Sequence, residues 1–162
     1  MLRRGVRQHD LVGAYHEDSG ATTIDGDQTD NSAVSSGAVH VIVRNGDEWH
    51  RQACFKPSNS KAYDSFGYSV AISGDSLIVG TPGKGSLVGA AHVFRRIGTS
   101  WYQEAQLKGS NTASSHQFGN AVAISGDTVI VGALSESSDA VGVNGVPLGG
   151  YVPGSGDRKS VV

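Results

Sequence analysis

The amino-acid sequence predicts an all-β protein built from repeated units, and three observations predict it. Glycine supplies 23 of the 162 residues, about twice the usual share of ~7%, as expected of a chain with many turns. Apolar residues come in short β-branched runs such as Leu77-Ile78-Val79, which are typical of strands. Residues 66–81 return as residues 118–133, an offset of 52, with roughly 11 of 16 positions identical, so one structural unit recurs along the chain.

Each unit is predicted to contain four strands. In the complete copy they cover residues 68–73, 76–81, 89–96 and 101–107. Gly74-Asp75 favours a type II′ hairpin turn, and Asn45-Gly46 in the earlier copy favours a turn with positive φ at both central positions. The inner strands are apolar throughout, which predicts burial on both faces, whereas the last strand mixes in polar residues. A four-stranded antiparallel sheet stacked between copies of itself is a blade of a β-propeller.

The repeats predict a partial, unclosed β-propeller of about two to three blades. We expect a partial blade at 1–57 with an inserted Asp-rich loop at 15–36, a complete blade at 58–109, an incomplete third blade at 110–152 and an unmatched tail at 153–162. Closed propellers have about 4 to 8 blades. We therefore expect the remaining blades of a longer chain, or self-association, to cover the end faces, and the unmatched ends favour a fragment of a longer protein.

Charge and composition exclude several classes of function. The chain has 13 Lys and Arg against 15 Asp and Glu, so no basic field exists to hold a nucleic acid. No apolar run approaches the ~18 residues of a membrane-spanning helix, so we expect no membrane insertion. The N-terminal segment lacks the apolar core of a secretory signal. The one cysteine, Cys54, excludes an internal disulfide and is expected to be half-exposed and without a function.

The same motifs carry a family resemblance. Phe66-Gly67 followed by Ile78-Val79-Gly80-Thr81-Pro82, and Phe118-Gly119 followed by Val131-Gly132-Ala133, resemble FG-GAP repeats, which build the β-propeller of integrin α-subunits and of many surface proteins. The resemblance covers residues 11 to about 145. It implies an extracellular or cell-surface location and a role in adhesion.

The inserted loop carries the candidate metal ligands. Asp25, Asp27 and Asp30 alternate with a glycine that permits a sharp turn, and carboxylate oxygens at such spacing suit Ca²⁺. The resemblance implies the same ion, because integrin-type members hold Ca²⁺ in Asp-rich loops of their blades. The alternative is that these aspartates cap turns with their own side chains and keep a long loop soluble. Both interpretations stay open on the sequence alone.

Other repeat-equivalent residues are expected to be structural. His40 and His92 occupy the same strand position in successive blades, where packing is the expected role. Trp49 and Trp101 open the outer strand and either pack between blades or, where exposed, stack on a sugar. No nucleophile elbow, metalloprotease motif or recurring carboxylate pair is present, so no catalytic residue is expected.

The sequence therefore predicts a non-enzymatic interaction module whose loops and blade edges present a rigid surface to a protein or a glycan. Calcium in the Asp25 loop is part of this prediction. The alternatives are a carbohydrate-binding lectin that uses Trp49 or Trp101, and an accessory domain or fragment of a larger secreted hydrolase.

Overall fold

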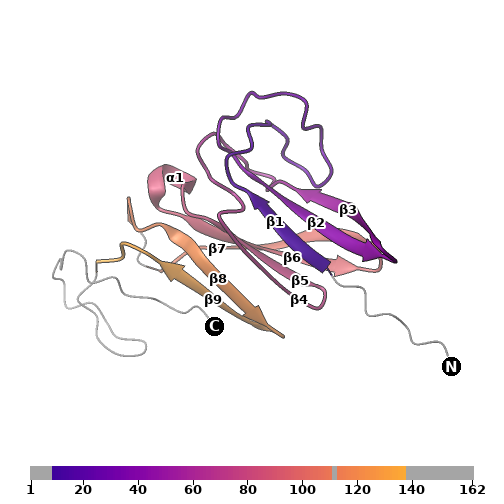
Figure 1. Ribbon diagram of the computed structural model, residues 1–162. Coiled ribbons are helices and arrows are strands. Elements are labelled where there is room, and N and C mark those ends of the chain that lie inside the picture. The colour runs from indigo at the N-terminus through magenta and orange to yellow at the C-terminus, as the bar shows by residue number, and fades with distance from the viewer. Residues whose placement is uncertain (1–8, 111–112, 138–162) are drawn as a thin grey trace.

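The structure is a computed structural model that describes residues 9–110 and 113–137, and this part of the chain is all-β (Figure 1). The first sheet has the strand order β1-β2-β3, the second β4-β5-β6-β7 and the third β8-β9, and every strand pair is antiparallel. The strands are β1 (His9–Ala14), β2 (Ala38–Asn45), β3 (Glu48–Phe55), β4 (Ser69–Ser73), β5 (Ser76–Thr81), β6 (Ala90–Ile97), β7 (Ser100–Leu107), β8 (Phe118–Ser125) and β9 (Thr128–Ala133).

All four strands predicted for the complete repeat form within one residue of their expected ends. The sequence did not predict α1 (Lys84–Leu87), a single turn between β5 and β6. Gly85 and Ser86 inside it have φ of +63° and +60°, so it is not a regular right-handed helix. The predicted continuation of the third blade to residue 152 and the tail 153–162 lie outside the described residues.

Two-residue turns that begin with glycine close the four hairpins of the described chain. Each of these glycines has positive φ: Gly46 (+65°), Gly74 (+59°), Gly98 (+64°) and Gly126 (+55°). The second residue of each turn has no positive φ, which agrees with the type II′ hairpin predicted at Gly74. The prediction for Asn45-Gly46 is wrong by one position, because Asn45 pairs with Glu48 as the last residue of β2 and leaves Gly46-Asp47 as the turn.

The sheets stack face to face, and the second sheet is buried on both faces. Leu77 and Val79 of β5 point into a core shared with the first sheet, where Phe66 also packs. Ile78, between them in the sequence, points into another core shared with the third sheet. All three β5 residues are fully buried, so this apolar run reflects burial on both faces, as predicted.

The second blade contacts the first through its Phe66-Gly67 segment. The Phe66 backbone N–H donates to the Ser36 carbonyl at 3.0 Å, and the Phe66 ring is fully buried. Gly67 has φ of +89°, and a Cβ there would lie only 2.6 Å from the Ala38 carbonyl oxygen. Only glycine permits this backbone approach at positive φ.

The third blade repeats this contact 52 positions later. The Phe118 N–H donates to the Val88 carbonyl at 3.1 Å, and Gly119 has φ of +90°. Gly80 of β5 receives the segment, because a Cβ on Gly80 would overlap the Gly119 carbonyl. Gly13 of β1 lies in the same way against the Gly67 carbonyl. The arrangement is a partial β-propeller whose antiparallel blades do not close a ring within the described residues.

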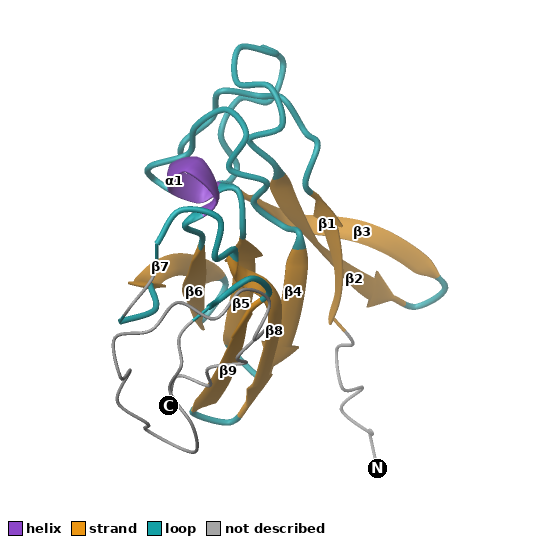
Figure 2. Ribbon diagram, turned by 90° about the vertical axis from the view of Figure 1, so that its left-hand side faces the viewer, coloured by secondary structure: helices purple, strands orange, loops and turns teal. Residues whose placement is uncertain are grey.

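The hairpin turns and the long connections lie at opposite ends of the blades (Figure 2). This follows from antiparallel pairing, in which successive connections alternate between the two ends of a sheet. We call the end with the long connections the loop end. Its segments are residues 15–37, 56–68, 82–89 and the described part of 108–117. The first connection is the longest because it holds the insertion.

Replacing Gly80 by alanine should lower the free energy of unfolding by about 3 kcal/mol, because the new methyl group would overlap the backbone of the next blade. The repeat-equivalent Gly132 is the matched control, since the nearest atom to a Cβ there would be 3.6 Å away. Gly132→Ala should change this free energy by less than about 1 kcal/mol. Urea denaturation measures both variants, and equal losses would contradict the inter-blade contact.

Candidate functional site

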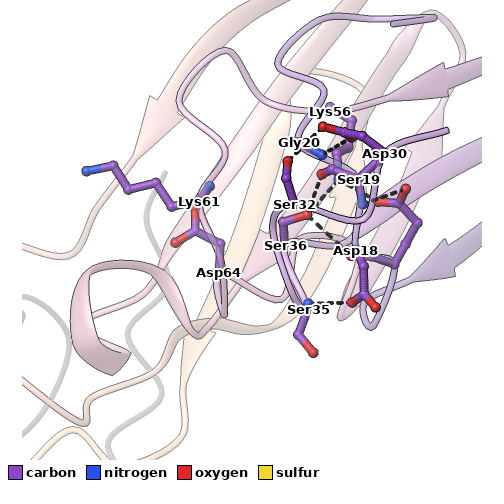
Figure 3. Close-up of polar contacts among 11 residues, drawn as sticks. Asp18, Ser19, Gly20, Asp30, Ser32, Ser35, Ser36, Lys56, Lys61 and Asp64 are labelled. Atoms are coloured by element: carbon purple, nitrogen blue, oxygen red, sulfur yellow. Dashed lines mark hydrogen bonds and ion pairs between the residues drawn. The ribbon is translucent and has the colours of Figure 1, made fainter. Parts of the chain in front are cut away.

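A buried lysine fixes the inserted connection of the loop end. Lys56, directly after β3, reaches Glu17 in the 15–37 connection, with 2.5 Å between Nζ and Oε2. Lys56 Nζ also donates to the Ser36 hydroxyl at 2.7 Å, and Ser36 Oγ donates to the Ser19 carbonyl at 2.9 Å (Figure 3). Lys56 is only 2% exposed, so this network rather than water satisfies its charge.

The same network keeps the Glu17 carboxylate ionised. Partial burial raises the pKa of Glu17, but hydrogen bonds from Lys56 and Ser19 outweigh that effect and leave the pKa below its ordinary value of 4.5. A carboxyl whose pKa is lower in the folded state stabilises the fold at pH values above 4.5, and this contribution is lost as the pH falls through the folded-state pKa. The inserted connection is therefore held most firmly near neutral pH.

A second buried ion pair joins α1 to the 56–68 connection. The distance between Lys84 Nζ and Asp64 Oδ2 is 2.5 Å, and Nζ also donates to the Asn59 carbonyl at 2.8 Å. Asp64 is 3% exposed. Lys84 and Glu17 each stand four residues after the glycine that receives the next blade. The first blade thus has a glutamate and the second blade a lysine at this position, and each of these two side chains forms an ion pair.

The insertion is attached to the first blade at two further points. Asp25 pairs with the outer edge of β3, where its N–H donates to the Cys54 carbonyl and the Cys54 N–H donates to Asp25 Oδ1, both at 2.8 Å. Ile24 packs against the core shared by the first two sheets. The insertion therefore covers part of an edge strand whose backbone groups would otherwise be open to another chain.

The predicted calcium ligands each accept hydrogen bonds within the protein. Asp25 binds the Cys54 N–H. Asp27 Oδ1 accepts from the Thr29 N–H and hydroxyl at 2.9 and 2.8 Å. Asp30 accepts from the Gly20 N–H at 2.8 Å and from the Ser32 hydroxyl at 2.7 Å, as Figure 3 shows.

These carboxylates do not fit a calcium cage in this conformation. Among the described residues no group of three or more His, Cys, Asp and Glu side chains is arranged to hold a metal ion. Hydrogen bonds from Thr29 lower the pKa of Asp27, and those from Ser32 and Gly20 lower that of Asp30. N–H and O–H donors thus bind one oxygen each of Asp25 and Asp27 and both oxygens of Asp30. Calcium binding stays a prediction that these contacts do not support.

Cys54 differs from its prediction. The thiol is buried rather than half-exposed, because the Asp25 segment lies along its strand. Burial is the main cause that raises the pKa of the Cys54 thiol to about 11. A thiol with so high a pKa is a poor nucleophile and a poor metal ligand at neutral pH.

The two predicted histidines lie in packed positions on β2 and β6. His92 is fully buried, with the Phe66 ring edge-on at 5.6 Å between centroids. Burial, followed by the positive charges of Lys84 and Lys108, lowers the pKa of His92 to about 4. Burial and then Arg51 lower the pKa of His40 as well. His92 is therefore neutral near pH 7, as expected of a packing residue.

The structure distinguishes the two predicted tryptophans. Trp101 is 7% exposed and packs edge-on against Phe55 of the neighbouring blade at 5.3 Å between ring centroids, so packing between blades is its role. Trp49 is 49% exposed. The guanidinium carbon of Arg44 lies 5.8 Å from the ring centroid of Trp49, and that of Arg96 lies 5.5 Å from the ring centroid of Trp101. The same arginine–tryptophan contact therefore occurs in both blades. Only Trp49 of the two presents its ring to solvent.

A group of exposed apolar side chains at the loop end was missed from the sequence. Its members lie on three of the loop-end connections and directly after β9: Tyr15, Val34, Tyr63, Tyr68, Leu87 and Leu134. Tyr15 and Tyr68 are in edge-to-face contact at 5.3 Å between centroids. The repeat alignment places asparagine or serine opposite two of the tyrosines, as Asn120 opposite Tyr68 and Ser115 opposite Tyr63, and this departure from the repeat was the available signal.

Stacked antiparallel blades with long loops at one end define a β-propeller-type repeat module. The chain belongs to the FG-GAP repeat family, which it matches over residues 49–94 and 101–145, more than half of its length. The predicted family is thus confirmed. No curated protein matches the chain. Within residues 9–110 and 113–137, no helix is long and apolar enough to cross a membrane.

Removing the buried Lys56 amine should strongly destabilise the first blade. We expect Lys56→Met to lower the free energy of unfolding by about 3 kcal/mol, because Glu17 is left without its charged partner. Arg95→Ala is the matched control: the exposed Arg95–Glu104 pair spans 3.9 Å, and its loss should cost less than about 0.5 kcal/mol. Thermal and urea denaturation measure both, and a Lys56 variant as stable as the control would contradict the role of this network.

Calcium titration tests the Asp25 loop directly. Because the three carboxylates already accept protein hydrogen bonds, we expect millimolar Ca²⁺ to leave the melting temperature unchanged relative to the same concentration of Mg²⁺. A saturable increase with Ca²⁺ that is lost in Asp27→Asn would show that the loop rearranges into a calcium site.

Proposed function

We propose that this chain is a non-enzymatic FG-GAP interaction module that binds an extracellular protein through its loop end. FG-GAP repeats are typically extracellular and generally non-enzymatic, and the proposal places this chain among them. The observation that carries the proposal is the group of exposed tyrosine and aliphatic side chains on the loop-end connections. Tyrosine is enriched at protein interfaces, where it supplies a large apolar surface and a polar tip.

The Tyr15–Tyr68 pair is the proposed centre of this surface. Tyr15 directly follows β1 of the first blade and Tyr68 precedes β4 of the second, so the pair bridges two blades. His16 stacks on Tyr15 at 4.2 Å between centroids, and its Nδ1 lies 3.1 Å from the Ser35 hydroxyl. Tyr63 is 67% exposed on the adjoining connection. Aromatic anchors of this kind carry much of the free energy of binding at protein interfaces.

The connections beneath these side chains are held in place before any partner binds. The Lys56–Glu17 and Lys84–Asp64 ion pairs join three of them to one another. Binding by an ordered loop loses less conformational entropy than binding by a mobile one. This supports loop-end recognition by a preformed surface rather than by a segment that folds on its partner.

A glycan ligand is the second candidate, and the exposed ring of Trp49 favours it. Sugars stack on exposed aromatic faces. Trp49 lies on the first sheet near the β2–β3 hairpin, away from the loop end, so the two candidates use different surfaces and different residues.

Further blades are proposed as partners of the outer face of the third sheet. Ile130 is 52% exposed, although its repeat-equivalent Ile78 is fully buried under the third sheet. A blade from the same longer chain or from a second copy would bury Ile130 in the same way. This contact is separate from the loop end and leaves Tyr15 and Tyr68 accessible.

Binding assays on matched tyrosine variants test the proposal. The fluorescently labelled, tetramerised chain is applied to arrays of extracellular proteins and of glycans. We expect protein binding that falls at least tenfold in the Tyr15→Ser/Tyr68→Ser variant, as loss of two interface anchors implies. Tyr102→Ser is the control, because Tyr102 is 54% exposed on β7 near the hairpin end, and it should bind normally.

Two results would contradict loop-end recognition. Protein binding that survives the double variant but falls in Tyr102→Ser would place the interface at the other end of the blades. Binding confined to the glycan array and lost in Trp49→Ala would favour the lectin instead.

A further inference from the structure

Three polar side chains of the second sheet form a row on the face that packs toward the first blade. His92 on β6 lies directly opposite Gln106 on β7 and opposite Val79 on β5. Thr81 follows Val79 by two positions on β5, which places it on the same face as His92. Directly opposite residues of an antiparallel pair have Cβ atoms about 5 Å apart, and diagonal neighbours are within reach of longer side chains. His92 is therefore a neighbour of both Gln106 and Thr81.

Each of them presents a buried hydrogen-bond donor without a partner in the described protein. The atoms are Thr81 Oγ1, His92 Nε2 and Gln106 Nε2. Thr81 and His92 are fully buried. Leaving such a donor unpaired costs far more than a hydrogen bond ordinarily contributes, so buried polar groups nearly always have a partner.

The contacts of the two glutamines decide which atoms are donors. The Ser58 N–H donates to Gln103 Oε1 at 3.2 Å, so the Gln103 amide nitrogen faces His92 Nδ1, 3.4 Å away. His92 Nδ1 must then accept, and a neutral imidazole carries its proton on Nε2. Gln106 Oε1 accepts from Asn59 Nδ2 at 3.2 Å, which leaves the NH₂ group of Gln106 unpaired.

A fourth donor comes from the connection that covers this face. Ser60 Oγ is also buried without a partner, and it follows Asn59, which contacts Gln106. Lys84 and Lys108 also lie close enough to act on His92, and Lys84 is paired with Asp64. The surroundings are thus rich in donors.

The first blade lacks this arrangement at the equivalent positions. Ala14 stands in place of Thr81 and Cys54 in place of Gln106, and neither offers a strong donor. Only the histidine is shared, as His40. The donor row is therefore a property of the second sheet and not a general consequence of the repeat.

We propose that Thr81, His92 and Gln106 bind a small hydrogen-bond acceptor, a water molecule or a halide ion, enclosed between the first two blades beneath Ser60. Either species accepts several hydrogen bonds at one point, which is the chemistry that unpaired donors on both sides of His92 require. Through hydrogen bonds to this one buried water or ion, the site links β5, β6 and β7 to the 56–68 connection.

The sign of the change in melting temperature on Thr81→Val tests the proposal, because valine has nearly the shape of threonine but no hydroxyl. With an acceptor in place, the variant loses a buried hydrogen bond, and we expect its melting temperature to fall by about 4 °C. Thr81→Ser keeps the hydroxyl and should fall less. Thr128→Val on the exposed position of β9 is the control and should not change.

Anion exchange and crystallography distinguish the two acceptors. A wild-type melting temperature that rises with chloride over gluconate at equal ionic strength, with an anomalous bromide peak near His92 Nε2, would identify a halide. Insensitivity to the anion together with an oxygen peak about 3 Å from His92 Nε2 and Gln106 Nε2 would identify water. A melting temperature of Thr81→Val that is unchanged or raised, with no peak at this position, would overturn the proposal.

Discussion

The contact between each Phe-Gly segment and the glycine-bearing strand of the blade before it is the constraint on which the rest of the structure depends. Gly67 and Gly119 take positive φ so that their backbones lie directly on the preceding sheet, and the adjoining phenylalanine rings are buried in the two cores. This backbone approach sets the spacing between sheets, so the alternating side chains of β5 fill a core on each side. Glycine is needed on both surfaces, as Gly13 and Gly80 show, because any Cβ would force the sheets apart.

Once the blades are spaced, the two ends of the molecule acquire different roles. Two-residue glycine turns fix one end, since their length sets the register of each hairpin. The other end holds connections long enough to carry their own contacts, and the buried Lys56–Glu17 and Lys84–Asp64 pairs order them. Exposed tyrosines then lie on a supported surface. Recognition placed on ordered loops above a rigid sheet is the common arrangement in repeat proteins of this kind.

Much of the fold was predictable because two copies of the repeat show the same pattern of apolar residues and glycines. The strand ends, the burial of Leu77 to Val79 on both faces and the family follow from residues 66–81 and their copy. Unrepeated features were harder to predict: the turn at Gly46 was misplaced by one residue, and Cys54 was expected to be half-exposed because the path of the insertion along β3 cannot be deduced from the chain alone. The pairing of Lys56 with Glu17 depends on contacts between segments 39 residues apart. The tyrosine surface depends on how separate loops pack next to one another.

Native-state hydrogen exchange tests the inter-blade contact most directly. The Phe66 and Phe118 amides donate to the Ser36 and Val88 carbonyls of the preceding blade. If these contacts hold the blades together, the two amides exchange as slowly as those of β5 and only through global unfolding. Exchange as fast as that of the exposed hairpin-turn residues Asp75 and Asp127 would show that the blades do not depend on the Phe-Gly contact and would contradict this account.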